Sequence, residues 1–261
     1  MGWFAYFLFT SHNKNYLGNM LLSSKAIVLH TLRYTDGKLI VDMLTQEAGR
    51  QSFLLHRSKT RRSSAPSVNM FQPLSMVEIE WNYREQKQLQ QLRSAHATPL
   101  KSIPYDIRKT SVALFLAEVL SGALRGEPIT PQLFDFLQNS VLWLDEASVG
   151  TENFHITFLR RLIPFLGFEP NVEDYVEGSY FDLLNGVFTP TEPRHEHFLR
   201  PQEALLLPNL LRMNFGNLHL FAFTSAERAR LLDFMVAYYR LHLPQFNEPK
   251  SLQVLHDIFR A

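Results

Sequence analysis

Positive charge is concentrated in one short segment of this sequence, HRSKTRRSSAP at residues 56–66. Its first seven positions carry four Lys or Arg residues and one His, and the nearest acidic residues are Glu47 before it and Glu78 after it. Cations clustered on a loop can neutralise phosphates and release the counterions condensed on a polyanion. An ordinary solvated loop is the alternative explanation. The pattern favours phosphate binding, with an affinity that falls steeply as salt rises.

The candidate polyanion-binding residues come from this segment and from the parts of the chain around it. Residues inside the segment would lie on the loop, whereas those beside it would extend the charge onto a strand. Arg84 is an outlier along the chain, and Lys25 has the weakest case because the first residues of strands often carry an exposed Lys. The set comprises Lys25, Arg50, His56, Arg57, Lys59, Arg61, Arg62 and Arg84.

Charge also divides the whole chain into two unlike parts, although its net charge is only +1. Residues 1–110 carry 15 Lys and Arg against 7 Asp and Glu, a net of +8. Residues 111–261 carry 11 against 18, a net of −7. A basic front part suits a polyanion, whereas an acidic rear part does not suit binding one across a broad face. We therefore expect two units with different partners.

The pattern of the front part predicts a small β-barrel. Asp36-Gly37 separates two apolar runs, which is a good hairpin signal. Five strands with a basic loop predict an OB-fold barrel over residues 20–103, with an SH3-like barrel as the main alternative. Such barrels stack bases on aromatic side chains, and the candidates, some of which must be core, are Tyr34, Phe53, Trp81 and Tyr83. The expected strands span residues 25–34, 38–45, 50–56, 71–81 and 87–100.

A helical period follows Pro104 and predicts a helical domain over residues 104–261, so the fold class is α+β. Thr130-Pro131 and the capping box of Thr224 with Glu227 mark two helix starts, and Pro164 should kink or break a third helix that ends at Gly167. An irregular insert is expected at about residues 170–200. A Phe-rich stripe, interpreted as core with a peptide groove as the minority alternative, comprises Phe134, Phe136, Phe154, Phe158 and Phe165. Five or six helices are expected, including segments at residues 106–124, 132–147, 151–167, 200–213 and 225–243.

Other polar groups give weaker signals for chemistry. His195, Glu196 and His197 lie close together, but a metal site needs a further ligand and fixed geometry, so we interpret them as surface residues. The acidic pairs Asp145-Glu146 and Glu173-Asp174 are interpreted as solvated charge. The sequence contains no GxGxxG, GxxxxGK[ST] or HExxH motif, and no nucleophile has a recognisable triad arrangement. We therefore expect no enzyme.

The absence of Cys excludes disulfides, thiol catalysis and thiolate metal sites, and it fits a reducing cytoplasm. The apolar run at residues 1–10 is too short to span a bilayer and lacks the features of a signal peptide. Because Met20 stands just before the first strand-like segment, we interpret residues 1–19 as an over-long gene start or a disordered extension, with a functional anchor as the alternative. No later run is long enough for a transmembrane helix, so no membrane partner is expected.

Several motifs, in their order and spacing, resemble the RecO family of bacterial DNA repair proteins. Residues 26–36 match the strand pattern A-x-V-L-x-x-x-x-Y-x-E/D, and residues 45–50 match T-x-E-x-G-R before a basic loop. FQPL at residues 71–74 resembles the L-Q-P-F/L strand of the family. Residues 162–170 resemble its L-L-x-x-L-G-F-x-P helix end, and residues 250–255 its closing K-S-x-x-x-L helix. The resemblance runs from about residue 22 to the end of the chain.

This resemblance implies an N-terminal OB-fold, a C-terminal helical domain and a non-enzymatic recombination mediator of the bacterial cytoplasm and nucleoid. Such proteins bind single- and double-stranded DNA and anneal complementary strands. They engage the acidic, apolar C-terminal tail of the single-stranded DNA-binding protein and, with RecR, help to load RecA on coated DNA. The tail should need an apolar pocket with nearby cations, and Arg160 and Arg161 are the adjacent cations of the helical part. Those two arginines could instead flank a solvent face.

One departure from the family concerns zinc. Many family members carry a four-Cys zinc site around a Y-F-D-x-x-x-G segment, and residues 180–186 keep that segment without any Cys. We therefore expect no cofactor, and we expect aromatic packing in place of the metal, by Tyr175, Tyr180, Phe181 and Phe188. A protein-interaction scaffold with an OB-like or SH3-like barrel is the main functional alternative, and an unrecognised hydrolase or transferase is a third.

Overall fold

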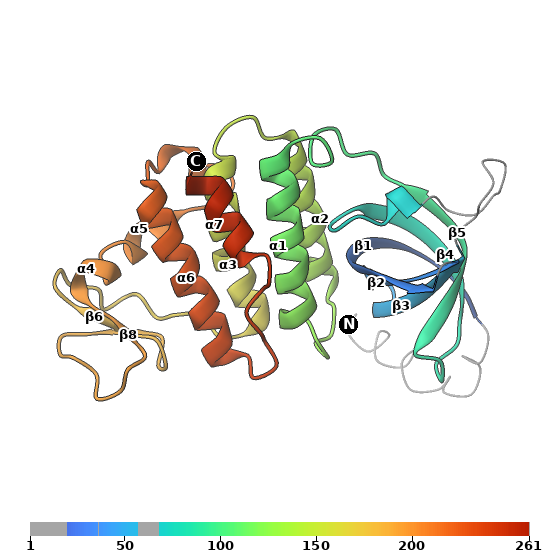
Figure 1. Ribbon diagram of the computed structural model, residues 1–261. Coiled ribbons are helices and arrows are strands. Elements are labelled where there is room, and N and C mark those ends of the chain that lie inside the picture. The colour runs from blue at the N-terminus through green and yellow to red at the C-terminus, as the bar shows by residue number, and fades with distance from the viewer. Residues whose placement is uncertain (1–19, 36, 57–67, 261) are drawn as a thin grey trace, which may run out of the picture. The chain divides into compact units, whose positions relative to one another are not determined.

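Five strands close into a barrel in the order β1-β2-β3-β5-β4, which is the OB-fold predicted from the sequence (Figure 1). The structure is a computed structural model, and it describes residues 20–35, 37–56 and 68–260. The barrel closes through a parallel pairing of β3 with β5, whereas its other strand pairs are antiparallel. The strands are β1 (Met20–Thr35), β2 (Lys38–Thr45), β3 (Gly49–His56), β4 (Met76–Tyr83) and β5 (Leu89–Ala97).

The first strand is longer than its sequence pattern suggested. It begins at Met20 rather than at residue 25, because its first half pairs with β4 and its second half pairs with β2. Thr35 pairs with Lys38, so two residues connect β1 to β2, as the Asp-Gly signal predicted. At the next turn Gly49 has a left-handed φ of 64°, which glycine adopts without a steric penalty.

The fourth strand begins later than predicted, at Met76 instead of residue 71. Residues before it form a turn in which Leu74 has a left-handed φ of 59° and is buried. The Leu74 amide donates to the Val28 carbonyl at 2.8 Å, and the Val28 amide donates to the Ser75 carbonyl at 2.9 Å. These two hydrogen bonds hold the turn against an irregular point of β1, which explains the break in the alternating pattern.

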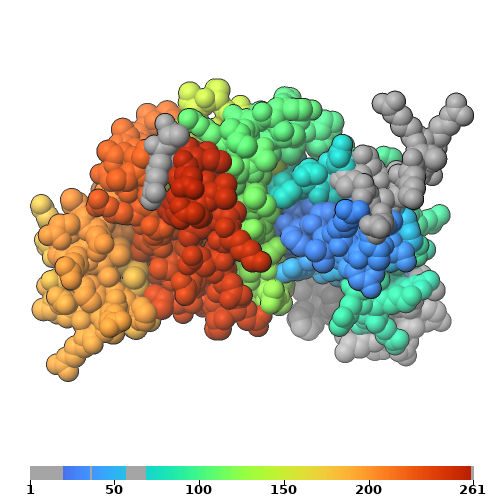
Figure 2. All heavy atoms as spheres, in the orientation of Figure 1, coloured from blue at the N-terminus to red at the C-terminus, as the bar shows by residue number. Residues whose placement is uncertain are grey.

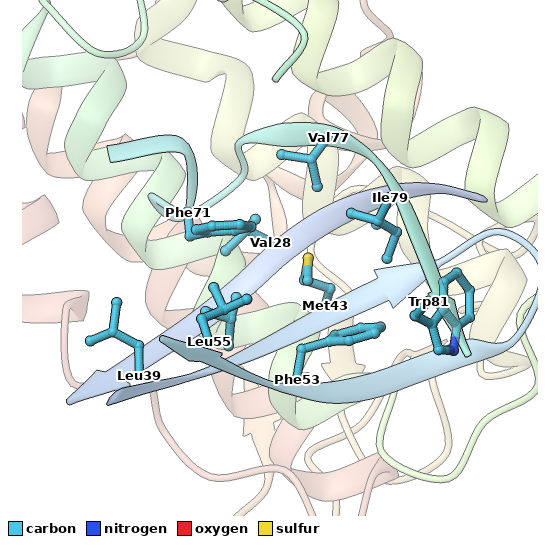
Figure 3. Close-up of a cluster of buried hydrophobic side chains, with 11 residues drawn as sticks. Val28, Leu39, Met43, Phe53, Leu55, Phe71, Val77, Ile79 and Trp81 are labelled. Carbon is cyan, nitrogen blue, oxygen red and sulfur yellow. The ribbon is translucent and has the colours of Figure 1, made fainter. Parts of the chain in front are cut away.

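The barrel core contains two of the aromatic side chains that were candidates for base stacking. Phe53 and Trp81 are both 0% exposed and meet edge to face, with their ring centroids 5.6 Å apart (Figure 3). Phe53 and Trp81 are therefore the candidates that belong to the core and not to a stacking surface, because on strands of alternating pattern they occupy the inward-facing positions. Tyr34 is exposed and Tyr83 is half-buried. Figure 3 shows Phe53 and Trp81 together with the aliphatic core, which includes Val28, Leu39, Met43, Leu55, Val77 and Ile79.

The rear of the chain is helical, and helices α1, α2, α3 and α6 lie side by side (Figure 1). Asp106 caps α1 by accepting from two backbone amides, and Thr224 forms the predicted capping box with Glu227 at the start of α6. Helix α3 continues through Pro164 and ends at left-handed Gly167, so Pro164 does not break it. The helices are α1 (Ile107–Ala123), α2 (Pro131–Glu146), α3 (Thr151–Leu166), α4 (Pro201–Ala204), α5 (Leu207–Arg212), α6 (Ser225–His242) and α7 (Leu252–Arg260).

The described part of the chain holds seven α-helices, more than the five or six expected, because the predicted segment at residues 200–213 splits into α4 and α5. Helix α7 lies on the surface of the helical unit in Figure 2, where it is coloured dark red. By their contacts, the described residues up to Pro99 form one compact unit together with Pro128–Phe134. Leu100–Glu127 and the described residues from Asp135 onward form the other unit. Within the described residues, no helix is long and apolar enough to cross a membrane.

The insert is more regular than predicted, because it contains a three-stranded sheet in the order β7-β6-β8. Phe188 packs edge to face on Tyr175 and on Phe181, at centroid distances of 4.9 and 5.0 Å, as expected for an aromatic cluster. Tyr180 packs on Phe198. The strands are β6 (Tyr180–Asp182), β7 (Val187–Thr189) and β8 (Phe198–Leu199).

The prediction that Asp145 is a solvated charge was wrong, because this residue is only 5% exposed. It accepts hydrogen bonds from the backbone amides of Lys101, Ser102 and Ile103 at 2.7–2.9 Å. Burial by itself would raise the pKa of Asp145, but these hydrogen bonds outweigh it and lower the pKa below its ordinary value. Asp145 therefore fixes the segment that leads into α1.

Candidate nucleic-acid interface

An open cleft of about 480 Å³ lies in the barrel beside the parallel pairing of β3 with β5. The ends of β3 and β4, the turn between β4 and β5, and β5 itself all contribute side chains. Because β3 and β5 are far apart in sequence, only the closure of the barrel brings these side chains together. The lining consists of Leu54, His56, Asn82, Arg84, Lys87, Leu89, Gln90, Gln91, Leu92 and Arg93.

The cleft is positively charged. Arg84, Lys87 and Arg93 are exposed side chains on its lining, and His56 joins them from the end of β3. None of the described residues that line it is acidic. Cations that converge on one concave surface focus the potential there and attract an anionic ligand. This arrangement suits the phosphates of a nucleic acid.

A buried glutamine holds the turn that carries two of these cations. Gln90 is 2% exposed, and its side-chain amide donates to the carbonyls of Arg84 at 2.9 Å and Lys87 at 2.6 Å. Its side-chain oxygen accepts from the Arg84 amide at 3.1 Å. A turn fixed at three backbone groups keeps the attached cations near one place, so less conformational entropy is lost when a ligand binds.

The structure separates the predicted residues into groups. It brings His56 and Arg84 together in the cleft, although they are distant in the sequence. It places Arg50 near the start of β3, where its guanidinium forms an ion pair with Asp42 at 3.3 Å. Arg57, Lys59, Arg61 and Arg62 lie outside the described residues, so their role as phosphate ligands stays a prediction.

Lys25 lies on a different surface, where acidic side chains predominate. It is exposed on β1 and pairs directly with Glu78 of β4, and Glu80 follows on the same exposed face. Opposite charges facing each other across strands attract, so Glu78 offsets much of the positive potential that Lys25 would offer to DNA. Lys25 therefore remains the least supported member of the set.

Sequence reasoning missed Lys87 and Arg93. Arg93 follows Leu89 and Gln91 on alternate positions of β5, and these residues share one face of the strand. Lys87 lies in the β4–β5 turn. The order of strands in an OB-fold places β5 beside β3, so the predicted fold itself carried the signal that these side chains lie near His56.

The two arginines proposed for partner binding have different surroundings. Arg160 pairs with Glu169 at 3.0 Å, and its side chain is 13% exposed beside a narrow apolar pocket with about 10 Å³ of free space. Its Nε and Nη1 are buried without a hydrogen-bond partner in the described structure. Arg161 is exposed. The apolar lining of the pocket includes Ile163, Phe181, Leu207, Leu210, Phe234 and Met235.

The histidines of the insert take part in a structural network. His195 Nε2 lies 3.2 Å from the Asp182 carboxylate, which also accepts from the Asn185 side chain at 2.7 Å. Burial by itself would raise the pKa of Asp182. The hydrogen bonds from Asn185, His195 and Leu184 outweigh this effect, so the pKa lies below its ordinary value. Within the residues that the structure describes, no group of three or more acidic, His or Cys residues could hold a metal ion.

Comparison with known proteins identifies relatives of both parts of the chain. The family model for the recombination protein O N terminal matches residues 20–99, and that for the recombination protein O C terminal matches residues 104–253. The DNA repair protein RecO of Phocaeicola vulgatus is 47% identical over 241 residues, which are 92% of this chain and 100% of the relative. Those of Bacteroides fragilis and Porphyromonas gingivalis are 46% and 35% identical, with the same two coverages.

Proposed function

Because the chain belongs to the RecO family of DNA repair proteins, we propose that it acts as a recombination mediator. In this role it binds single- and double-stranded DNA and anneals complementary strands. With RecR it helps to load RecA onto DNA that is coated by the single-stranded DNA-binding protein. It performs no chemical step of its own, and its place is on the nucleoid in the bacterial cytoplasm.

The observation that carries this proposal is the cationic cleft of the barrel. Arg84, Lys87 and Arg93 lie around one concave surface, and the described residues that line this surface include no Asp or Glu. Each phosphate that such a cation neutralises releases condensed counterions, which favours binding and makes it depend on salt. The predicted ligands of residues 57–62 would add to the same electrostatic effect.

Annealing follows from charge neutralisation. Two complementary strands repel each other through their phosphates, and this repulsion slows the encounter that precedes pairing. A protein that covers phosphates with Arg and Lys lowers the repulsion and raises the local concentration of strands. The bases then pair without any covalent chemistry, so no catalytic residue is required.

We place the tail of the single-stranded DNA-binding protein at the Arg160 pocket. The tail is acidic and apolar, and the pocket combines an apolar lining with a guanidinium whose Nε and Nη1 are buried without a hydrogen-bond partner in the described structure. A carboxylate of the tail would accept from those groups, which relieves the cost of burying them unpaired. The free space of about 10 Å³ is small, so neighbouring side chains must move to admit an apolar residue of the tail.

An annealing assay tests the proposal. Two labelled complementary oligonucleotides are mixed at low and moderate salt with the wild type and with the Arg84→Ala, Lys87→Ala, Arg93→Ala triple variant. We expect salt-sensitive annealing by the wild type and a loss of at least about tenfold in the variant, because three phosphate contacts are removed. The matched control removes three exposed cations of the helical unit, Arg125, Arg230 and Lys250, and should anneal nearly as well as the wild type.

The outcomes separate the alternatives. If the wild type neither binds nor anneals DNA at any salt concentration, the mediator proposal is wrong and a protein-interaction scaffold becomes the better hypothesis. If the control triple variant loses as much activity as the cleft variant, net charge rather than the cleft explains binding.

A second experiment tests the partner site with a synthetic peptide of the tail. Arg160→Ala should weaken peptide binding, whereas Arg161→Ala, on the next residue of the same helix, should not. Equal affinity of both variants and the wild type would contradict the placement of the tail at Arg160.

A further inference from the structure

We infer that Asp42 restrains DNA binding by this protein: its carboxylate competes with DNA phosphates for Arg50 and so keeps bound DNA releasable. The inference rests on the proposed DNA-binding function and adds to it a residue that limits the strength of binding. It explains a carboxylate on a surface where phosphate recognition by itself would favour only cations.

Asp42 is an isolated negative charge on a cationic part of the barrel. Within the described strands β1, β2, β3 and β5 it is the single acidic residue, whereas Glu78 and Glu80 lie on β4. A carboxylate among cations lowers the potential that attracts a polyanion. The basic and histidine residues of the same four strands are Lys25, His30, Arg33, Lys38, Arg50, His56, Arg93 and His96.

Strand pairing places Asp42 beside the cationic cleft. It pairs directly with Ser52 of β3, and Ser52 pairs in turn with Leu89 of β5, which lines the cleft. Alternate residues of β3 share one face, so Arg50 and Ser52 lie in a row with Leu54 of the cleft lining. Arg50 is four residues from Leu54, which is about 13 Å along a strand. DNA that leaves the cleft along this row therefore reaches Arg50 and its carboxylate partner.

The Asp42 carboxylate binds two neighbouring polar side chains. Its Oδ2 accepts from Nη2 of Arg50 at 3.3 Å, and its Oδ1 accepts from Oγ of Ser52 at 2.5 Å. The side chains of Arg50 and Asp42 are 26% and 22% exposed, so salt screens this ion pair less than a fully exposed pair. The pair is electrically neutral, so Arg50 attracts a phosphate less strongly than an arginine without a carboxylate beside it. A phosphate gains the full charge of Arg50 only if the ion pair with Asp42 breaks.

A restraint of this kind suits a protein that anneals strands. Covering phosphates brings two strands together, but the duplex must then leave before the protein acts on another pair of strands. Differences in affinity between closely related complexes lie mostly in the dissociation rate. By weakening the contact of Arg50 with DNA, Asp42 therefore shortens the time for which the duplex stays bound.

Substitution of Asp42 in the full chain tests the inference. Asp42→Asn removes the charge but keeps the size of the side chain and an oxygen that accepts from Ser52. Affinity for a labelled oligothymidylate of about 16 nucleotides is measured by fluorescence anisotropy at several salt concentrations. We expect about two- to fivefold tighter binding at low salt, which is the range over which a partly exposed ion pair shifts an equilibrium. The slope of log affinity against log salt should steepen by about 0.7, because one more phosphate contact forms. A duplex of the same length should dissociate more slowly by about the same factor as the gain in affinity.

Two comparisons establish whether the effect passes through Arg50. Glu248→Gln is the matched control, because Glu248 of the helical unit forms an ion pair with Arg240 at 3.1 Å and its substitution removes the same charge. This control should bind the oligothymidylate as the wild type does. In an Arg50→Ala background, Asp42→Asn should no longer tighten binding, as expected of two residues that act through one contact. Thermal melting establishes that each variant is folded, and Asp42→Thr, whose β-branched side chain suits a strand, repeats the test if Asp42→Asn does not fold.

The result separates this inference from the function on which it rests. Binding by Asp42→Asn that is equal to or weaker than that of the wild type would overturn the inference and leave DNA binding intact. A gain that persists in the Arg50→Ala background, or that Glu248→Gln reproduces, would come from net charge and also overturn it. If the wild type binds no DNA at any salt concentration, the proposed function itself fails and the inference fails with it.

Discussion

His155 should make the stability of this protein fall as the solution becomes mildly acidic. Its imidazole in α3 is 2% exposed, stacks on Phe259 of α7 with centroids 5.1 Å apart, and has an Nδ1 without a hydrogen-bond partner in the described residues. Burial first, and then the positive charges of Arg228 and His256, lower the pKa of His155 to about 3. The folded protein therefore keeps this side chain neutral.

The sign of the effect follows from comparing the folded and unfolded chains. An unfolded His has a pKa of about 6.5, so between pH 6.5 and pH 3 the unfolded chain binds a proton that the folded protein does not. Stability is therefore lost as pH falls through this window. For one group with these two pKa values, the free energy of unfolding decreases by about 2 kcal/mol between pH 7.5 and pH 5.

The assay is urea unfolding followed by far-UV circular dichroism at these two pH values, for the wild type and for His155→Phe. Phenylalanine keeps the ring that stacks on Phe259 and removes the titrating group. We expect the variant to lose about 2 kcal/mol less than the wild type on acidification. The exposed His219, replaced by Gln, serves as the control and should behave like the wild type. A loss of stability in His155→Phe as large as that of the wild type would refute the reasoning.

Three further predictions concern the barrel and the start of α1. The Arg84→Ala, Lys87→Ala, Arg93→Ala variant should reduce the slope of log affinity for single strands against log salt by about 2, because each lost phosphate contact contributes about 0.7; an unchanged slope would contradict phosphate contacts by these residues. Gln90→Leu should lower the free energy of unfolding by about 1–3 kcal/mol in urea and weaken binding of single strands, because the turn loses its hydrogen bonds. Asp145→Ala should cost about 2–4 kcal/mol in the same measurement, because three backbone amides lose their acceptor, and a cost below about 0.5 kcal/mol would show that water replaces it.

Local sequence signals predicted local structure well. The Asp-Gly pair between β1 and β2 and the capping box of Thr224 with Glu227 each specify backbone hydrogen bonds within a few residues. The helix end at Gly167 is similar, since glycine adopts the left-handed conformation that terminates α3. The order of five strands before a set of helices predicted the α+β class and favoured an OB-fold over an SH3-like barrel, and the family resemblance implied the OB-fold.

Signals that depend on distant partners were left open for Phe53 and Trp81 and were misinterpreted for Asp145. Phe53 and Trp81 are aromatic residues in a basic barrel, and only strand pairing decides that they face each other in the core. In the sequence, Asp145 is one of two adjacent acids of the kind usually found at the surface. Only the fold brings the backbone amides of residues 101–103 within hydrogen-bonding distance of its carboxylate. An aromatic or acidic residue can lie on the buried or on the exposed side of its strand or helix, and only the packing of distant segments decides which side it is.

By itself, the sequence determined that the front of the chain is a basic barrel without thiol chemistry, because charge, the lack of Cys and hydrophobic period are properties of the chain alone. Only the tertiary structure decided which cations converge. His56 ends β3, Arg84 lies in the turn after β4 and Arg93 lies in β5, and the parallel pairing of β3 with β5 closes the barrel and places them around one cleft. The physical reason is that a concave surface depends on distances in space, whereas a charge pattern records only distances along the chain.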